Sequence, residues 1–219
     1  MFNKVKNWIS DNPDLSFAIL LSICVYAYFG LTNELFPTHR TGFAIMERFA
    51  VLGLVGLALT LCIIAGEIDL SIGSNAALAA VITVRFTDSL GAPSALLIAL
   101  LVSTSIGAIQ GYFIAYLRVR AIVLTVGTLM LLRGVALFAA EEKTVMLTDF
   151  RVPDFISTKM LWYFSPASLL VILMFIIVGL FMGYTRFGRE IYAIGGARKE
   201  AIAAGISLKR PMIIVFAIS

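Results

Sequence analysis

Two acidic residues within an apolar part of the chain are the first candidates for chemistry. Glu67 and Asp69 lie two residues apart in the run AGEIDLSIGSN, with Gly66 and Gly73 on either side. A carboxylate in hydrocarbon costs about 3 kcal/mol or more, so each must be neutralised, paired or hydrated. In one interpretation, Asp69 or Ser71 caps a helix that begins at this break. In the other, the break lines a water-filled path, where irregular backbone and polar groups meet a solute.

A second group of polar residues lies in the apolar stretch 121–140. Arg133 is expected to point into a helical bundle and to find an acid or a carbonyl oxygen. Its isolation, and that of the two acids, motivates the hypothesis that Arg133 pairs with Glu67 or Asp69. Thr125 and Thr128 offer hydroxyl groups, although threonine in a span commonly bonds back to its own helix. The candidate residues of a substrate path are Glu67, Asp69, Ser71, Thr125, Thr128 and Arg133.

Catalytic chemistry has little support in the sequence. The chain holds no GxxxxGK[ST] phosphate-binding loop and no HExxH zinc motif, so we expect neither ATP hydrolysis nor a catalytic metal. Its single histidine, His39, falls in a loop, and Cys24 and Cys62 both fall in apolar stretches. These residues offer no nucleophile–base pair, disulfide framework or metal cluster. We therefore expect a chain that is not an enzyme and binds no metal or cofactor itself.

The composition places these residues in a membrane. The chain has 219 residues, of which 60% are hydrophobic and 14% are charged, and its mean hydropathy is +0.98. A soluble domain of that size could not bury so much apolar surface, so we expect an all-α, polytopic bundle of transmembrane helices. The net charge of +4 could indicate nucleic acid. The cations gather in the loops of one side, however, which favours the lipid bilayer as partner and argues against nucleic acid.

Six apolar stretches can form complete spans, and a seventh is cut short. They are residues 16–32, 49–65, 74–84, 94–117, 121–140 and 166–184, with 212–219 as the start of another. The stretch 74–84 is short for a full crossing. With the N-terminus in the cytoplasm, inner segments hold ten Lys and Arg residues and outer segments hold six, which favours this orientation. The polar lead contains Lys4 and Lys6, and the longest outer loop contains Glu142 and Asp149.

A long polar interval at residues 185–210 separates two apolar stretches. It carries six cations against two acids, Glu190 and Glu200, so we expect it to face the cytoplasm. Gly195-Gly196 is expected to break the chain, residues 197–204 to form a short helix, and Gly205 to end that helix. A surface helix held between two spans could grip a soluble partner. Alternatively, a basic loop could simply rest on acidic lipid.

Three stretches resemble the permeases of bacterial ABC importers for ribose and related sugars. The run FGREIYAIGGARKEAIAAGISLKR resembles their cytoplasmic loop, and Glu200-Ala201 through Gly205 resembles their EAA–Gly motif. AGEIDLSIGSN resembles their GGIDLS-type signature, with Glu67 where a glycine is common. AIVLTVGTLMLLRG resembles their FIVTLGT…RG segment. The matches occur in the family's order and extend from the second span to the end of the chain.

This resemblance implies one permease domain over residues 1–219, incomplete at its C-terminus, in the bacterial inner membrane. It implies that residues 185–210 form the loop that couples to a cytoplasmic ABC ATPase, which would bind the ATP. The other implied partners are a second permease subunit, as a homo- or heterodimer, and an extracytoplasmic solute-binding protein. The transported solute would be a monosaccharide or a sugar-like molecule. The implied coupling residues are Arg186, Gly188, Arg189, Gly195, Gly196, Arg198, Lys199, Glu200, Ala201 and Gly205.

Two other classes of function compete with this expectation. A self-contained secondary carrier or channel could use Glu67 or Asp69 as an ion or proton site, because broken helices with intramembrane acids are typical of such proteins. A purely structural subunit is the third class. Uptake that needs ATP and a binding protein would favour the importer, whereas uptake driven by an ion gradient would favour the carrier.

Overall fold

The described part of the chain is helical. The computed structural model describes residues 12–141, 143, 146, 150–160 and 162–219, and these form helices joined by turns. The helices are α2 (Pro13–Thr32), α3 (His39–Ile64), α4 (Ile72–Leu90), α5 (Ala92–Leu117), α6 (Ala121–Ala139), α7 (Arg151–Ile156), α8 (Pro166–Tyr184), α9 (Arg186–Gly196), α10 (Arg198–Ala203) and α11 (Lys209–Ile218). The all-α expectation is confirmed for these residues. Lys4 and Lys6 of the polar lead, and Glu142 and Asp149 of the longest outer loop, lie outside the described residues.

Five of these helices, α2, α3, α5, α6 and α8, are long and apolar enough to cross a membrane. Each coincides with one of the six complete spans expected from the sequence. The remaining expected span, 74–84, lies within α4, which has 19 residues but carries Ser74 and Asn75 near its start and Arg85 and Asp88 near its end. The expectation of six complete spans is thus met for five, and the stretch expected to begin a seventh lies in α11.

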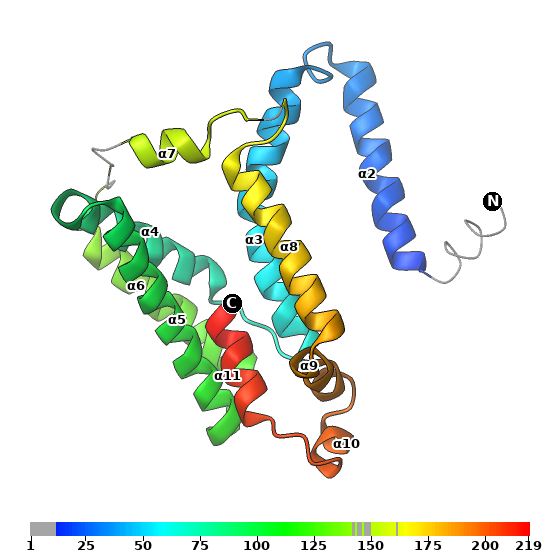
Figure 1. Ribbon diagram of the computed structural model, residues 1–219, viewed down its shortest axis with the longest axis vertical. Helices are drawn as coiled ribbons and strands as arrows, with labels where there is room; N and C mark the ends of the chain where they lie inside the picture. Colours follow the sequence, from blue (N-terminus) through cyan, green and yellow to red (C-terminus); the bar gives the residue numbers. More distant parts are fainter. Residues whose placement is uncertain (1–11, 142, 144–145, 147–149, 161) are drawn as a thin grey trace.

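The helices form two groups that meet at one end (Figure 1). In one group α3 and α8 pack side by side; in the other α4 lies between α5 and α6, and α11 packs along α5. Helices α9 and α10 lie at the end where the groups meet, which we call the α9 end. The opposite end carries α7 and is called the α7 end. Helix α2 stands apart from both groups and has no buried residue.

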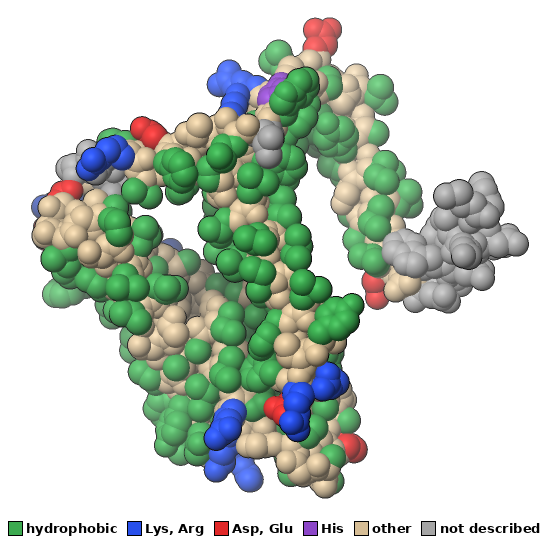
Figure 2. Space-filling model, in the orientation of Figure 1, with side chains coloured by type: hydrophobic (Ala, Val, Ile, Leu, Met, Phe, Trp, Pro, Cys, Tyr) green, Lys and Arg blue, Asp and Glu red, His purple; other side chains and the backbone are tan. Residues whose placement is uncertain are grey.

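The best-packed core lies at the α9 end. Ile191 and Ile194 of α9 and Met212, Val215 and Phe216 of α11 are at most 2% exposed. They form one hydrophobic cluster with the last turns of α3 and α5. Toward the α7 end the two groups separate, and Figure 2 shows open space between them. Helix packing therefore joins the groups chiefly at the α9 end.

Glycines bring α5 and α11 into backbone contact. A Cβ atom at Gly107 would overlap the carbonyl oxygen of Phe216, and one at Gly111 would lie 2.6 Å from the Cα atom of Ile213. The two glycines are four residues apart, so they lie on one face of α5. Only a residue without a side chain fits there, and α11 therefore lies directly on α5 over successive turns.

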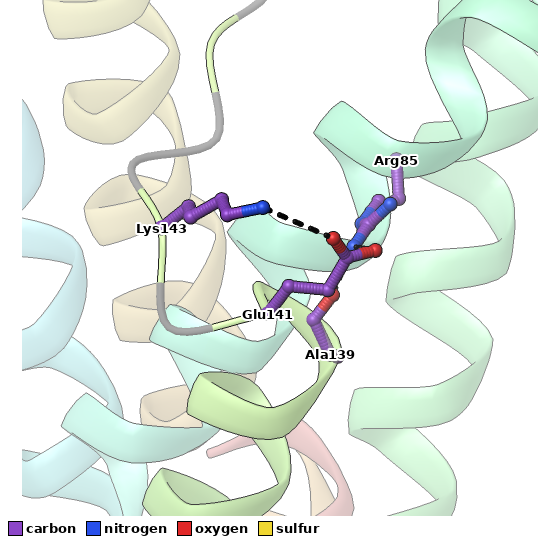
Figure 3. A network of polar contacts seen from close by, with 4 residues as sticks. All are labelled: Arg85, Ala139, Glu141 and Lys143. Carbon is purple, nitrogen blue, oxygen red and sulfur yellow. Dashed lines mark hydrogen bonds and ion pairs between the residues drawn. The ribbon is translucent and has the colours of Figure 1, made fainter.

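One polar contact ties α4 to the end of α6 at the α7 end (Figure 3). Arg85 Nη2 lies 2.5 Å from Glu141 Oε1, and Arg85 Nε donates to the carbonyl oxygen of Ala139 at 3.0 Å. Lys143 Nζ lies 3.9 Å from the other carboxylate oxygen of Glu141. All three charged side chains face solvent, so this connection is exposed.

Candidate functional site

Helix α3 ends at a break of residues 65–71 that leads into α4. Gly66 has a φ of +78°, and its amide donates to the carbonyl oxygen of Ile63 at 2.9 Å. The next amide, of Glu67, donates to the carbonyl oxygen of Cys62 at 2.9 Å. These two bonds around a left-handed residue form a Schellman motif, which favours glycine at the position of Gly66. Local backbone chemistry therefore ends α3 at this point.

The break is in direct contact with α9. A Cβ atom at Gly195 would overlap the carbonyl oxygen of Ile64, and one at Gly66 would lie 3.3 Å from the Cα atom of Gly195. Glycine is therefore needed on both sides of this contact. Two of the three stretches that carry the family resemblance thus touch through their backbones.

Glu67 pairs with the segment 185–210, for which the sequence predicts a coupling role and which we therefore call the coupling segment. Arg198 Nη2 donates to Glu67 Oε1 at 2.5 Å, and the Glu67 side chain is only 14% exposed. The guanidinium compensates a mostly buried carboxylate. The hypothesis that Arg133 pairs with Glu67 or Asp69 is wrong, because Arg133 is exposed on α6 and the cation beside Glu67 comes from α10. The tertiary packing that brings α10 to the break decides the pairing.

Asp69 lies at the centre of a buried polar network and is 3% exposed. Its Oδ1 accepts from the Ser71 amide at 2.8 Å and from Ser71 Oγ at 2.7 Å, while its Oδ2 accepts from Ser219 Oγ at 3.0 Å. Gln110 Nε2 donates to Ser71 Oγ at 2.9 Å. Buried polar groups are stable when they are satisfied in this way. The network joins the break to α5 through Gln110 and to the end of α11 through Ser219.

The same residues shape the start of α4. Ser71 precedes the first residue of α4, and its side chain accepts no bond from the amides of the first turn. Asp69 instead accepts the Ser71 amide, and Ser74 Oγ donates to the Ser71 carbonyl oxygen at 2.8 Å. Asp69 therefore orders the turn that leads into α4 rather than capping its first turn. Its part in lining a path stays a prediction.

The two candidate threonines of α6 differ in their contacts. Thr125 is fully buried, and its hydroxyl lies 3.4 Å from the carbonyl oxygen of Ile68 in the break. Thr128 donates at 2.9 Å to a carbonyl oxygen of its own helix, as threonine in a span commonly does. The structure thus gathers Glu67, Asp69, Ser71 and Thr125 at the break, whereas Thr128 and Arg133 lie further along α6.

Helix α9 forms the first part of the coupling segment. Thr185 Oγ1 accepts the amide of Gly188 at 3.1 Å and so caps the helix start. The helix buries Ile191 and Ile194, whereas Arg186 and Arg189 on its other face are exposed. Helix α9 runs through both glycines and ends at Gly196, so the break expected at Gly195-Gly196 falls one residue later, at Ala197. The absence of a side chain at Gly195 permits the close contact with α3, and the sequence alone does not reveal this contact.

Helix α10 (Arg198–Ala203) confirms the short helix expected at 197–204. Gly205 has a φ of +82° and ends α10 through the same pair of backbone bonds that ends α3, as the sequence predicts. Lys199 and Glu200 are exposed on this helix, while Ala201 is buried in the cluster at the α9 end. The coupling segment therefore has an anchored face and a free, charged face.

Two members of the network, Gln110 and Ser219, were missed from the sequence. Gln110 carries the only side-chain amide of α5 and lies between Gly107 and Gly111, which is a usable signal for a buried contact. Ser219 carries no such signal, because its role depends on how α11 packs. Within the described residues, no three His, Cys, Asp or Glu side chains are grouped to hold a metal ion.

Several apolar helices, a buried polar break and an amphipathic helix pair at one end define a multi-pass membrane protein organised around that break. More specifically, the chain belongs to the family described as branched-chain amino acid transport system / permease component, whose model matches residues 42–219. Membership of this family and the five apolar helices make it a multi-pass protein of the bacterial inner membrane.

Two relatives illustrate the similarity. The chain is 29% identical over 221 residues to the autoinducer 2 import system permease protein LsrC of Yersinia enterocolitica, a match that covers 100% of this chain and 60% of LsrC. It is 28% identical over 229 residues to the D-allose transport system permease protein AlsC of Escherichia coli, covering 99% of this chain and 69% of AlsC. The chain thus spans 60% to 69% of the length of these relatives. No solved structure matches it.

Proposed function

We propose that this chain is the membrane permease subunit of an ABC importer, which moves a monosaccharide or sugar-like solute across the inner membrane with ATP hydrolysed by a partner subunit. The observation that carries the proposal is the contact of the coupling segment with the polar break, through Gly195 and through the Arg198–Glu67 ion pair. Family membership supports it, and relatives named for autoinducer 2 import and D-allose transport favour a sugar-like solute over an amino acid.

The distribution of cations supports a cytoplasmic α9 end. The described Lys and Arg residues at that end are Arg118, Arg120, Arg186, Arg189, Arg198, Lys199, Lys209 and Arg210. Those at the α7 end are Arg40, Arg48, Arg85, Lys143, Arg151 and Lys159, and Arg133 lies within α6. Because cations are retained on the cytoplasmic side, the α9 end faces inward. The start of α2 lies toward the same side as α9 (Figure 1), which supports the proposal of a cytoplasmic N-terminus.

The coupling segment offers the partner ATPase a charged surface. Arg186 and Arg189 on α9 and Lys199 and Glu200 on α10 are exposed. The opposite face of the segment is held in the core of the α9 end. A push on the exposed face is therefore delivered to the bundle, because a close-packed interior transmits displacement instead of absorbing it.

The push reaches the bundle by two routes at the break. Gly195 contacts the backbone at the end of α3, and Arg198 forms an ion pair with Glu67. From there Asp69 is bonded to Ser219 of α11, and Ser71 is bonded to Gln110 of α5. Displacement of α9 and α10 thus shifts α5 and α11 relative to α3. The α7 end, where the helix groups already separate, opens and closes in response.

The solute path runs beside the break in this proposal. Sugar hydroxyl groups need hydrogen-bonding partners inside the membrane, and irregular backbone lines water-filled paths there. Asp69, Ser71 and Thr125 are the candidate groups at the break, and because they are buried, a solute reaches them only when the break rearranges. Thr128 and Arg133 lie further along α6. The remaining partners are a second permease subunit beside this chain and a solute-binding protein at the α7 end.

The test is uptake by the full-length permease reconstituted with its ATPase and binding protein. We expect uptake to require ATP and both partners, and an ion gradient alone to drive none. Uptake by the permease alone under an ion gradient would overturn the proposal in favour of a secondary carrier that uses Glu67 or Asp69.

Side-specific labelling tests the orientation with a matched pair of exposed lysines. In a background without the native cysteines, Lys199→Cys should react with a membrane-impermeant thiol reagent only from the cytoplasm and should crosslink to the ATPase. Lys159→Cys should react only from outside. Labelling of Lys199→Cys from outside would contradict both the orientation and the coupling role.

A further inference from the structure

A cleft of about 820 Å³ lies at the α9 end, next to the coupling segment. Arg118 and Arg120, in the turn between α5 and α6, line one side of it. Arg198 of α10 and Lys209 of α11 line the other side, and Gly66–Ile68 of the break contribute to it as well. The cleft therefore lies where the ends of two apolar helices, α5 and α6, meet the polar segments at that end.

The charges around the cleft are unbalanced. Its lining contains four cations and one acid, Glu67, which is already paired with Arg198. Arg118 and Arg120 are exposed, and Lys209 Nζ lies 4.5 Å from the centre of the Tyr116 ring. This excess of positive charge in one cleft gives it a positive potential that attracts an anion.

One wall of the cleft is apolar and leads into the membrane-facing surface. Ile122 and Val123, in the first turn of α6, line it and are 53% and 65% exposed. They belong to a helix that is apolar enough to cross a membrane. A ligand that fits both walls has an anionic group for the arginines and a hydrocarbon tail for this face.

We propose that the cleft binds the phosphate headgroup of an anionic phospholipid from the inner leaflet. The phosphate lies between the Arg118–Arg120 turn and Lys209, and an acyl chain follows Ile122 and Val123 along α6. Basic pockets between membrane helices on the cytoplasmic side recognise such headgroups. The proposal goes beyond transport, since it needs the membrane position of α6 but neither the ATPase nor the solute.

The experiment measures lipid binding to the purified full chain by native mass spectrometry and by thermal unfolding in nanodiscs. Phosphatidylglycerol is compared with phosphatidylcholine. We expect Arg118→Gln/Arg120→Gln to weaken phosphatidylglycerol binding about tenfold or more, because both charge-assisted hydrogen bonds to the phosphate are lost. The matched control is Arg186→Gln/Arg189→Gln, which removes two exposed cations at the same end but outside the cleft. It should bind as the unmodified chain does.

Three outcomes would overturn the proposal. Equal loss in both double variants would mean general attraction to an acidic surface. Equal protection by free inorganic phosphate would mean a site for a soluble anion. Unchanged lipid binding with loss of ATPase binding would mean a protein-docking cleft. Arg120→Gln/Lys209→Gln repeats the test without touching Arg118, whose φ of 55° makes it sensitive to substitution.

Discussion

Two ion pairs, one at each end of the bundle, have the same length but different surroundings. Arg198–Glu67 at the α9 end and Arg85–Glu141 at the α7 end both have a nitrogen–oxygen distance of 2.5 Å. The side chains of the first pair are 44% and 14% exposed, and those of the second are 41% and 61% exposed. The two ion pairs therefore differ in the burial of the carboxylate: Glu67 is mostly buried, and Glu141 is mostly exposed. Removing the partner of a buried acid costs much more than breaking a solvated pair.

The difference extends to the helices that the pairs connect. At the α9 end, the glycine contact between α9 and α3 and the glycine contacts between α5 and α11 reinforce the ion pair. At the α7 end the helix groups diverge, and the Arg85–Glu141 contact joins α4 to the exposed turn after α6 (Figure 3). The α9 end is thus closely packed, whereas the α7 end is held by a solvent-exposed contact. Three substitutions test this contrast, and they are taken from the largest expected effect to the smallest.

The largest effect is expected from Gly195→Ala. The new methyl group would overlap the carbonyl oxygen of Ile64, and a backbone atom cannot move aside as a flexible side chain can. We expect a loss of about 1–3 kcal/mol or more in unfolding free energy, together with loss of uptake. Thermal unfolding in detergent measures the first and the reconstituted transport assay the second.

The adjacent Gly196→Ala is the control for this substitution. Its Cβ atom meets nothing within 4 Å, so stability should stay within about 1 kcal/mol of the unmodified chain. Equal effects of the two substitutions would show that helix propensity, and not contact with α3, governs this site.

The second effect concerns the pair at the α9 end. Arg198→Ala leaves the mostly buried Glu67 carboxylate without its cation, so we expect a loss of about 1–3 kcal/mol. Glu67→Gln should cost less, because an amide oxygen still accepts from Arg198. The neighbouring Lys199→Ala, at an exposed position, should stay within about 0.5 kcal/mol. If Lys199→Ala lowered the unfolding free energy as much as Arg198→Ala does, the Arg198–Glu67 pair would not be what stabilises this end.

The smallest effect is expected at the α7 end. Arg85→Ala should cost about 0.2–1 kcal/mol, because Glu141 is solvated with or without its partner. Raising the salt concentration should erase this difference, while the effect of Arg198→Ala should persist because a buried pair is screened less. Chemical denaturation at low and high salt makes the comparison. Equal costs and equal salt dependence of the two variants would contradict the contrast between the ends.

The sequence predicted the parts of the fold that depend on local chemistry. The apolar stretches correspond to α2, α3, α5, α6 and α8, and Gly205 ends α10 as expected. It failed where distant segments meet. Arg198 and Glu67 are 131 residues apart, and nothing near either residue indicates the other. The sequence predicted a break next to Gly195 but not the close contact of Gly195 with α3, because that contact is a tertiary feature.

The glycine contacts between α5 and α11 have a mechanical consequence. Sliding α11 along α5 by about one turn would bring other side chains of the same α5 face against the α11 backbone in place of Gly107 and Gly111. The close contact therefore opposes axial slippage between the two helices. A displacement of either helix along its axis is expected to carry the other with it.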